Sequence, residues 1–459
     1  MKARHLIIPI LALCSNLLTA QDKTTRPTGS ILFGNRDRLS GHAIKVDENN
    51  NLIWNSPVLR NEVPLRISEI LEMSLRSPIG LKPKAGHIAK ITLTNGDTAY
   101  GTLSVLNEEY VTLITDYAGT LNLKRGAVSR LEITESERGI YAGPHDMANW
   151  TVADGPQSAW QLYNGQLVSS GSASIAQEFE LPEKAHISFS LDWRSSLKLS
   201  ILMLSDDGET DKPENHYHFQ LNRQNIYLRK RWEGGNGRGI GHSANIRALK
   251  EKENARFDFY VDRSTDTIAL YIDDEQAQIW NDAEPDTNSF GNWIHFISEE
   301  GFPVKISNIN ISEWTSGELP DDSLLAEDDD LSPEEGERIF MKNGDTLIGE
   351  VGKITDGLLS VESEFTPINV PIERINNIDL TKEKSDPLYD EAIRRKGDIR
   401  AWFKSGGRIT FRLDSFGDLT MHGSSQNFGE ASFDINAFSR IEFNIYNQEL
   451  NAKRRGDNW

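Results

Sequence analysis

Cysteine is almost absent from this sequence. Cys14 is the only one among 459 residues, and it lies in an N-terminal segment that we expect to be removed. A mature chain that begins after this segment has no thiol, which excludes disulfide bonds and thiolate metal sites. The stability of the folded protein must therefore come from packing.

Long hydrophobic runs and excess positive charge are also lacking. After residue 20 no apolar run approaches the roughly 20 residues that a membrane-spanning helix needs, so we expect no transmembrane segment. Lys and Arg number 49 against 69 Asp and Glu, which gives a net charge of −20. An acidic surface repels phosphate backbones, so we do not expect a nucleic acid partner.

The first 20 residues differ from the rest of the chain. Lys2 and Arg4 precede the apolar run 6–13, and small or polar residues continue to Ala20. This pattern is typical of a secretory signal peptide, to which we assign 1–20. We expect an exported protein, located in the periplasm, on the cell surface or outside the cell. Lipidation of Cys14 is the alternative, against which the large Leu13 argues.

Two similar hairpins stand far apart in the sequence, TNGDTAYG at 94–101 and KNGDTLIG at 342–349. Asn-Gly between two β-rich runs predicts a type I′ turn, in which both turn residues have positive φ. The later glycine, Gly101 or Gly349, predicts a bent strand in which a side chain would collide with its neighbour.

The similarity extends beyond these hairpins and recurs in two weaker copies, the last of which has Phe411 in the glycine position. In each copy an apolar residue of the last strand follows the turn at nearly constant distance: Asp37 to Ile70 is 33 positions, Asp97 to Leu131 is 34, Asp345 to Ile378 is 33 and Gly407 to Ile441 is 34. Four copies at nearly one spacing predict a repeated module.

Each copy contains about five short strands in about 50 residues. A sheet this small must close or pair its edges, so we expect a small barrel. The Asn-Gly-Asp turn, the bent-strand glycine and the closing Ile-x-x-Ile pattern resemble the SH3-like and Sm-like small barrels. Sm-like rings often bind RNA, but the basic residues of that role have no counterpart here. We place the four repeats at 28–76, 87–135, 338–382 and 397–446.

The middle of the chain, 145–315, has short alternating strands, turn clusters and no long helical period, which predicts an antiparallel sandwich. The predicted fold class is therefore all-β, with a central antiparallel jelly-roll sandwich and four small β-barrel repeats, two on each side. An acidic linker at 316–337 follows the sandwich, and a C-terminal tail at 447–459 follows the last repeat.

Three features of the middle segment carry a family resemblance: Trp160 followed by Leu167, the hairpin YIDD at 271–274, and the last strand 306–311. Their order resembles the concanavalin A-like jelly rolls, the laminin-G-like and 3-keto-disaccharide-hydrolase-like group. The resemblance implies a binding or scaffolding protein without enzymatic activity, with a glycan or a surface protein as partner. A glycan-active hydrolase or lyase of the 3-keto-disaccharide-hydrolase kind is the alternative. The sequence does not indicate the oligomeric state.

Two neighbouring runs of the sandwich, 216–222 and 225–231, alternate between apolar and polar residues. If these strands pair, the polar side chains share one face as a hydrogen-bonding, positively charged patch. The predicted ligand-binding residues are His216, His218, Gln220, Tyr227, Arg229 and Arg231. A plain solvated sheet face is the alternative, because one face of an antiparallel sheet is often wet.

No set of residues predicts catalysis. The sequence has no Gly-x-Ser-x-Gly elbow, no Glu-x-Asp-x-x-Glu strand motif and no cysteine nucleophile. Asp258, Asp262 and Asp273 are expected as solvated carboxylates at strand ends or turns. We expect no cofactor and no metal, because His216 and His218 lack a third ligand. The acidic stretch 206–211 is expected as a solvated turn and the glycine-rich stretch 234–242 as a mobile loop.

Overall fold

The computed structural model describes residues 27–35, 37–76, 87–135, 139–163, 165–235, 237–283, 290–314, 319, 337–363, 366–380, 397–404 and 406–455. The predicted signal peptide 1–20 with Cys14, and the predicted acidic linker apart from residues 319 and 337, lie outside the described residues. The strands form four antiparallel sheets, which confirms the all-β fold class. Among the described residues no helix is long and apolar enough to cross a bilayer.

Each repeat segment contains five strands. Repeat 1 has β1 (Thr28–Phe33), β2 (Arg38–Val46), β3 (Asn51–Asn55), β4 (Val63–Arg66) and β5 (Ile70–Arg76); repeat 2 has β6 (His87–Leu93), β7 (Thr98–Leu106), β8 (Tyr110–Thr115), β9 (Gly119–Lys124) and β10 (Val128–Glu135). Repeat 3 has β27 (Glu337–Met341), β28 (Thr346–Thr355), β29 (Leu358–Glu362), β30 (Pro367–Pro371) and β31 (Ile375–Asp379); repeat 4 has β32 (Asp398–Phe403), β33 (Arg408–Gly417), β34 (Thr420–Ser425), β35 (Gly429–Asp434) and β36 (Phe438–Glu442). Strand order is the same in all four, and a 3-10 turn precedes each fifth strand.

The second strand of each repeat bends, so that its first half pairs with the first strand and its second half with the third. A Cβ atom at Gly101 would lie 2.9 Å from the Ile114 carbonyl oxygen, and one at Gly349 would lie 2.6 Å from the Glu362 carbonyl oxygen. The predicted collision is therefore confirmed at both glycines.

Repeat 4 reverses this arrangement. Its glycine, Gly423, is on the third strand, where a Cβ atom would lie 2.2 Å from Cδ2 of Phe411. In repeat 2 the position of Gly423 is taken by Leu113, since Leu413 pairs with Gly423 as Leu103 pairs with Leu113. At the bend, a glycine on one strand lies beside a large side chain on the other. The glycine is on the second strand in repeat 2 and on the third strand in repeat 4, which explains how Phe411 replaces the expected glycine.

The type I′ prediction for the Asn-Gly turns is wrong. Gly96 has a φ of +78°, but Asn95 is not among the described residues with positive φ. The Gly96 N–H donates to the Leu93 carbonyl (2.8 Å) and the Leu93 N–H donates to the Asp97 carbonyl (2.8 Å). These bonds close a three-residue loop in which a type I turn is followed by a left-handed glycine. Asn95 stabilises it by accepting from the Asp97 N–H at 3.1 Å.

The equal spacing predicted for repeat 1 is also wrong. The fifth strands of the repeats pair with each other, Leu131 with Ile378 and Met73 with Ile441. Met73, rather than Ile70, therefore holds the position of these residues in repeat 1. Repeat 1 has the loop 56–62 between β3 and β4, where repeat 2 has only 116–118 between β8 and β9. These extra residues lengthen the distance in sequence from the first turn to the equivalent residue of the fifth strand.

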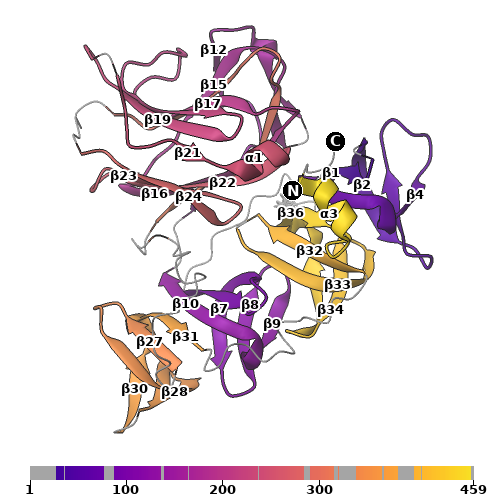
Figure 1. Ribbon diagram of the computed structural model, residues 1–459, viewed down its shortest axis with the longest axis vertical. Helices are drawn as coiled ribbons and strands as arrows, with labels where there is room; N and C mark the ends of the chain where they lie inside the picture. The colour runs from indigo at the N-terminus through magenta and orange to yellow at the C-terminus, as the bar shows by residue number, and fades with distance from the viewer. Residues whose placement is uncertain are drawn as a thin grey trace, which may run out of the picture.

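The repeats pair in a nested order. β5 pairs with β36 and β10 pairs with β31, so repeat 1 joins repeat 4 and repeat 2 joins repeat 3 in two ten-stranded sheets. Repeats 2 and 4 also touch, because the Asp97 carboxylate accepts hydrogen bonds from the N–H (2.7 Å) and hydroxyl (2.9 Å) of Thr410. The four repeats consequently lie in one row, in the order 3, 2, 4, 1 (Figure 1).

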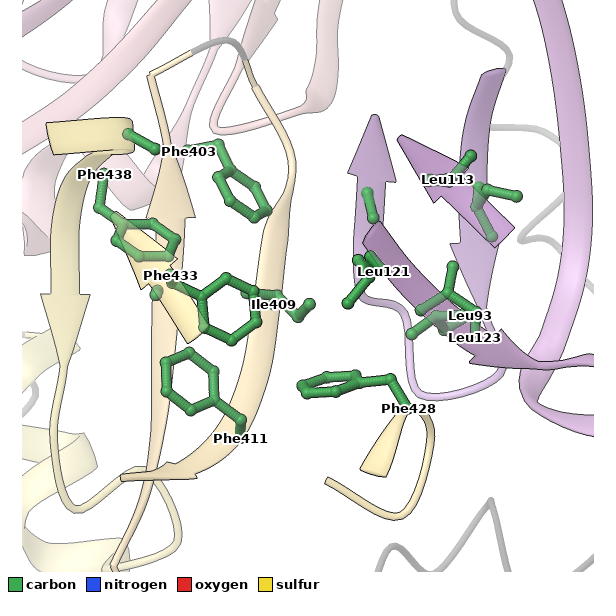
Figure 2. Close-up of a cluster of buried hydrophobic side chains, with 14 of the residues drawn as sticks. Leu93, Leu113, Leu121, Leu123, Phe403, Ile409, Phe411, Phe428, Phe433 and Phe438 are labelled. Atoms are coloured by element: carbon green, nitrogen blue, oxygen red, sulfur yellow. The ribbon is translucent and has the colours of Figure 1, made fainter. Parts of the chain in front are cut away.

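One hydrophobic cluster runs through the whole row. Figure 2 shows Phe428 of repeat 4 between the phenylalanines of its own repeat and the leucines of repeat 2, including Leu123. Its ring packs edge-on against Phe433 at 5.9 Å between centroids. The Lys124 N–H donates to the Asn427 carbonyl beside it (2.8 Å). Repeats 2 and 4 therefore share a core.

The sandwich has two sheets with a hydrophobic cluster of their own between them. The β18 sheet contains β12 (Thr151–Ala153), β15 (Ala173–Glu178), β25 (Trp293–Ser298), β17 (Lys198–Ser205), β18 (His216–Asn222), β19 (Asn225–Arg231), β20 (Arg238–Gly239) and β21 (Ala244–Asn245). The β16 sheet contains β11 (Gly139–Gly143), β13 (Trp160–Tyr163), β14 (Gln166–Ser169), β26 (Val304–Glu313), β16 (Lys184–Trp193), β22 (Asn254–Asp262), β23 (Thr267–Ile272) and β24 (Glu275–Asn281). β11 lies ahead of the sandwich boundary predicted at 145. The α-helices among the described residues are α1 (Arg247–Glu251) in the sandwich and α3 (Gln448–Arg455) in the tail.

The β16 sheet faces the repeats and the β18 sheet lies on the far side of the sandwich (Figure 1). The contact is polar: Asn254 donates to the Glu72 carboxylate (2.7 Å), Arg440 donates to Asn254 (2.6 Å), and the Gly407 N–H donates to Asp274 (3.1 Å). Because the sandwich and the repeats have separate hydrophobic clusters, these polar contacts dominate the junction.

Three aspartates predicted to be solvated are instead buried. Asp258 accepts from Arg256 (2.6 Å), Asp262 pairs with Lys184 (3.2 Å), and Asp273 accepts from the Lys252 amine (2.8 Å). Buried carboxylates need such partners, because leaving water without compensation is costly. Asp273 lies beside Arg440 of repeat 4, whereas Asp262 is enclosed by its own turn, where it accepts from Ser264. Sequence patterns do not reveal such burial.

Candidate functional site

β18 and β19 pair in the register that brings all six predicted ligand residues onto one face. His216 is opposite Arg231, His218 is opposite Arg229, and Gln220 is opposite Tyr227. The alternate residues Tyr217, Phe219, Leu221, Ile226 and Leu228 point into the sandwich core. The predicted side chains therefore lie on the outer face of the β18 sheet and are not divided between sheets.

Only part of this face is open to solvent. Gln220, Arg229 and Arg231 are exposed and Tyr227 is 43% exposed, whereas His218 is half-buried. His216 is only 3% exposed, so its assignment as a ligand-contacting residue needs correction. We call the set Gln220, Tyr227, Arg229, Arg231 and the exposed edge of His218 the open face.

The loop 206–215 covers part of the outer face, over β25 and beside His216. The Asp207 carbonyl lies 2.7 Å from Nε2 of His295, a fully buried outer-face residue of β25. Gly208 packs against the ring of Trp293, where a Cβ atom would lie 2.1 Å from a ring carbon. The backbone of the stretch 206–211 therefore forms a strap across the sheet, while its side chains Asp206, Asp207 and Glu209 are exposed, as expected of a solvated turn. The strap leaves β18 beyond His216, and β19, accessible.

The histidines of this face are neutral at physiological pH. Burial lowers the pKa of His216, His218 and His295 to about 4 in each case. The positive charge of Arg231 lowers the pKa of His216 and His218 further. His218 bonds through Nε2 to the Ser200 hydroxyl at 2.8 Å. The positive charge predicted for the patch therefore belongs to the arginines alone.

The glycine-rich stretch 234–242, predicted as a mobile loop, contributes the edge strand β20 instead. Gly239 pairs with Arg229 and Arg238 pairs with Lys230. The Arg238 guanidinium bonds to the Asp282 carboxylate, which also pairs with the buried Lys230 amine at 2.7 Å. This inward contact anchors the edge of the sheet, while Gly239 adds no side chain to the outer face beside Arg229.

Clusters of potential metal ligands are lacking among the described residues. No group of three or more His, Asp or Glu side chains within them is arranged to hold a metal ion. A small cavity of about 40 Å³ lies at the junction with the repeats. Its walls include the half-buried Arg256 and the buried Arg440, which serve the domain contact.

Sequence reasoning missed two parts of the site. Ser200, which positions His218, lies on β17, and the alternation of the run 198–205 was a signal that could have found it. The strap over His295 had no such signal, because its position depends on contacts between segments far apart in the chain.

Comparison with known proteins adds only distant similarities. No protein-family model and no curated protein matches the sequence. Solved galectin-like and other jelly-roll structures resemble about a third of the chain. The carbohydrate binding module CBM66 from Bacillus subtilis has 14% identity, 36% coverage of this chain, 96% of its own and a TM-score of 0.27.

Two further neighbours are similar to the same extent. The Emp46p carbohydrate recognition domain in its potassium-bound form has 11% identity, 41% coverage of this chain, 97% of its own and a TM-score of 0.30. Sheep galectin-11 in complex with glycerol has 6% identity and a TM-score of 0.24, and the match covers 30% of this chain and 95% of the galectin chain. At these values the similarities establish no function.

Proposed function

We propose that the protein is a non-enzymatic glycan-binding protein whose sugar ligand lies on the open face of the β18 sheet. The observation that carries this proposal is an exposed aromatic ring, Tyr227, directly opposite Gln220 and two positions from Arg229. An aromatic ring packs against the apolar face of a sugar, while amide and guanidinium groups bond to its hydroxyls.

The domain arrangement favours a scaffolding role for the repeats. The sandwich contacts them through the β16 sheet, so the open face points away from the row of repeats (Figure 1). A ligand on the β18 sheet therefore meets no steric hindrance from the repeats. A row of paired modules held by shared sheets and one core suits the fixed presentation of a binding face.

The experiment is a glycan array on the full chain, followed by affinity measurements and a turnover assay on each glycan that binds. Replacing Tyr227 by Ala should weaken binding at least about tenfold. The control is Tyr163→Ala, which removes a 63% exposed tyrosine from β13 of the opposite sheet and should leave affinity unchanged.

Three results would overturn the proposal. The absence of binding to any glycan would favour a protein ligand. Equal loss of affinity in both variants would place the ligand elsewhere. Breakdown of a bound glycan would favour the hydrolase or lyase alternative.

A further inference from the structure

Arg229 and Arg231 form a pair of free positive charges on the open face. They are two residues apart on β19, about 7 Å along the strand, and both are exposed on its outer side. Neither guanidinium makes a hydrogen bond or an ion pair with any described residue. Several other arginines of this acidic chain have carboxylate partners, among them Arg125, Arg256 and Arg440.

No negative charge on the two strands balances this pair. The run 216–231, which forms β18, the turn and β19, contains no Asp or Glu. The residues opposite the arginines are His216 and His218, and their low pKa values keep them uncharged near neutral pH. The acidic strap 206–215 reaches His216, but none of its carboxylates forms an ion pair with Arg229 or Arg231. These two arginines therefore keep their positive charge unpaired on the open face.

We infer that the ligand of the open face is an acidic glycan, whose carboxylate or sulfate group binds between Arg229 and Arg231. This inference rests on the proposed glycan-binding function. A guanidinium offers parallel N–H donors that match the oxygens of a carboxylate or a sulfate. The adjacent ring of Tyr227 then packs against the sugar that bears the acidic group.

The edge of the sheet leaves room for a polymer. Gly239, opposite Arg229 on β20, has no neighbour within 4 Å of the position that a Cβ atom would take. Gly239 therefore presents no side chain that would obstruct a chain of sugars at this edge. The site is therefore suited to an internal acidic unit as well as to a terminal one.

The test compares polymers that differ only in charge. The full chain is titrated with polygalacturonate and with its methyl-esterified form, and with dextran sulfate and unsulfated dextran. We expect the acidic member of at least one pair to bind at least about tenfold more tightly. The preference should shrink as salt rises from about 0.05 M to about 0.5 M, and should be constant from about pH 5.5 to 8 because the histidines remain neutral.

The matched variants are Arg229→Gln/Arg231→Gln and Arg66→Gln. The first should abolish the preference for the acidic polymer, and the second removes an exposed arginine of repeat 1 and should retain it. Equal affinity for charged and uncharged polymers, or a preference that survives in the double variant, overturns the inference but leaves glycan binding intact. If none of these polymers binds but neutral glycans do, the inference also fails. The absence of binding to any glycan removes the proposed function itself.

Discussion

Replacing Asp273 by Asn should loosen the junction between the sandwich and the repeats. Asp273 lies in the two-residue turn between β23 and β24, where its carboxylate accepts from the Arg256 N–H (2.9 Å) and from the Lys252 amine (2.8 Å). It also lies 3.6 Å from the guanidinium of Arg440 in repeat 4. Asparagine has the same size and tolerates the positive φ of 51° at this position, so the substitution removes mainly the charge.

The magnitude follows from the pKa of this carboxyl group. Burial alone would raise the pKa of Asp273, but Arg440, Lys252 and the bound N–H groups outweigh burial and lower it to about 2 from 3.8. A difference of this size corresponds to about 2 kcal/mol of stability. Because the folded pKa is depressed, this stability is present above about pH 4 and is lost as the pH falls towards 2.

Urea unfolding at neutral pH measures the change in free energy of unfolding, and small-angle scattering reports whether the sandwich stays against the repeats. The free energy of unfolding of the variant should be about 2 kcal/mol lower at neutral pH. Between about pH 4 and 2 the variant should not show the fall in stability that the unmodified protein shows. Asp345→Asn, at the exposed turn of repeat 3, is the control and should change stability by less than about 0.5 kcal/mol. An unchanged free energy and an unchanged acid profile for Asp273→Asn would refute the assigned role.

Three further predictions concern the repeats and the N-terminus. Replacing Gly96 by Val should destabilise the protein by roughly 1–3 kcal/mol in urea unfolding, because a β-branched residue is forced to a φ of +78°; a stable variant would contradict the turn geometry. Burial lowers the pKa of Lys404 to about 7, and its amine has no hydrogen-bond partner among the described residues. Lys404→Met should therefore stabilise the fold by up to about 4 kcal/mol near neutral pH, and this gain should shrink as the pH rises towards about 10. A gain that does not depend on pH would show that the buried charge of Lys404 is not its cause. Mass spectrometry of the mature protein should find Gln21 at the N-terminus, and retained Met1 or a lipid on Cys14 would disprove the predicted cleavage.

The sequence by itself determined the local features of this fold. The period-two alternation of 216–222 and 225–231 assigned each side chain to a face, because successive side chains of a strand point in opposite directions. The glycines at the strand bends of repeats 2 and 3 were identified from their place after the Asn-Gly turn, where a Cβ atom would collide with the next strand of the same repeat. Such features depend on residues that are near one another in the chain.

Only the tertiary structure decided which distant segments meet. The fifth strands present the same backbone N–H and C=O groups in every repeat, so nothing local specifies that repeat 1 pairs with repeat 4 rather than with repeat 2. The burial of His216 and the partners of Asp273 have the same origin, because the strap 206–215 and Arg440 reach these residues from other parts of the chain. At the bend of repeat 4, Phe411 is accommodated only because Gly423 lies opposite it in space. Burial and charge compensation are properties of the assembled surroundings of a residue, and these surroundings exist only once the chain has folded.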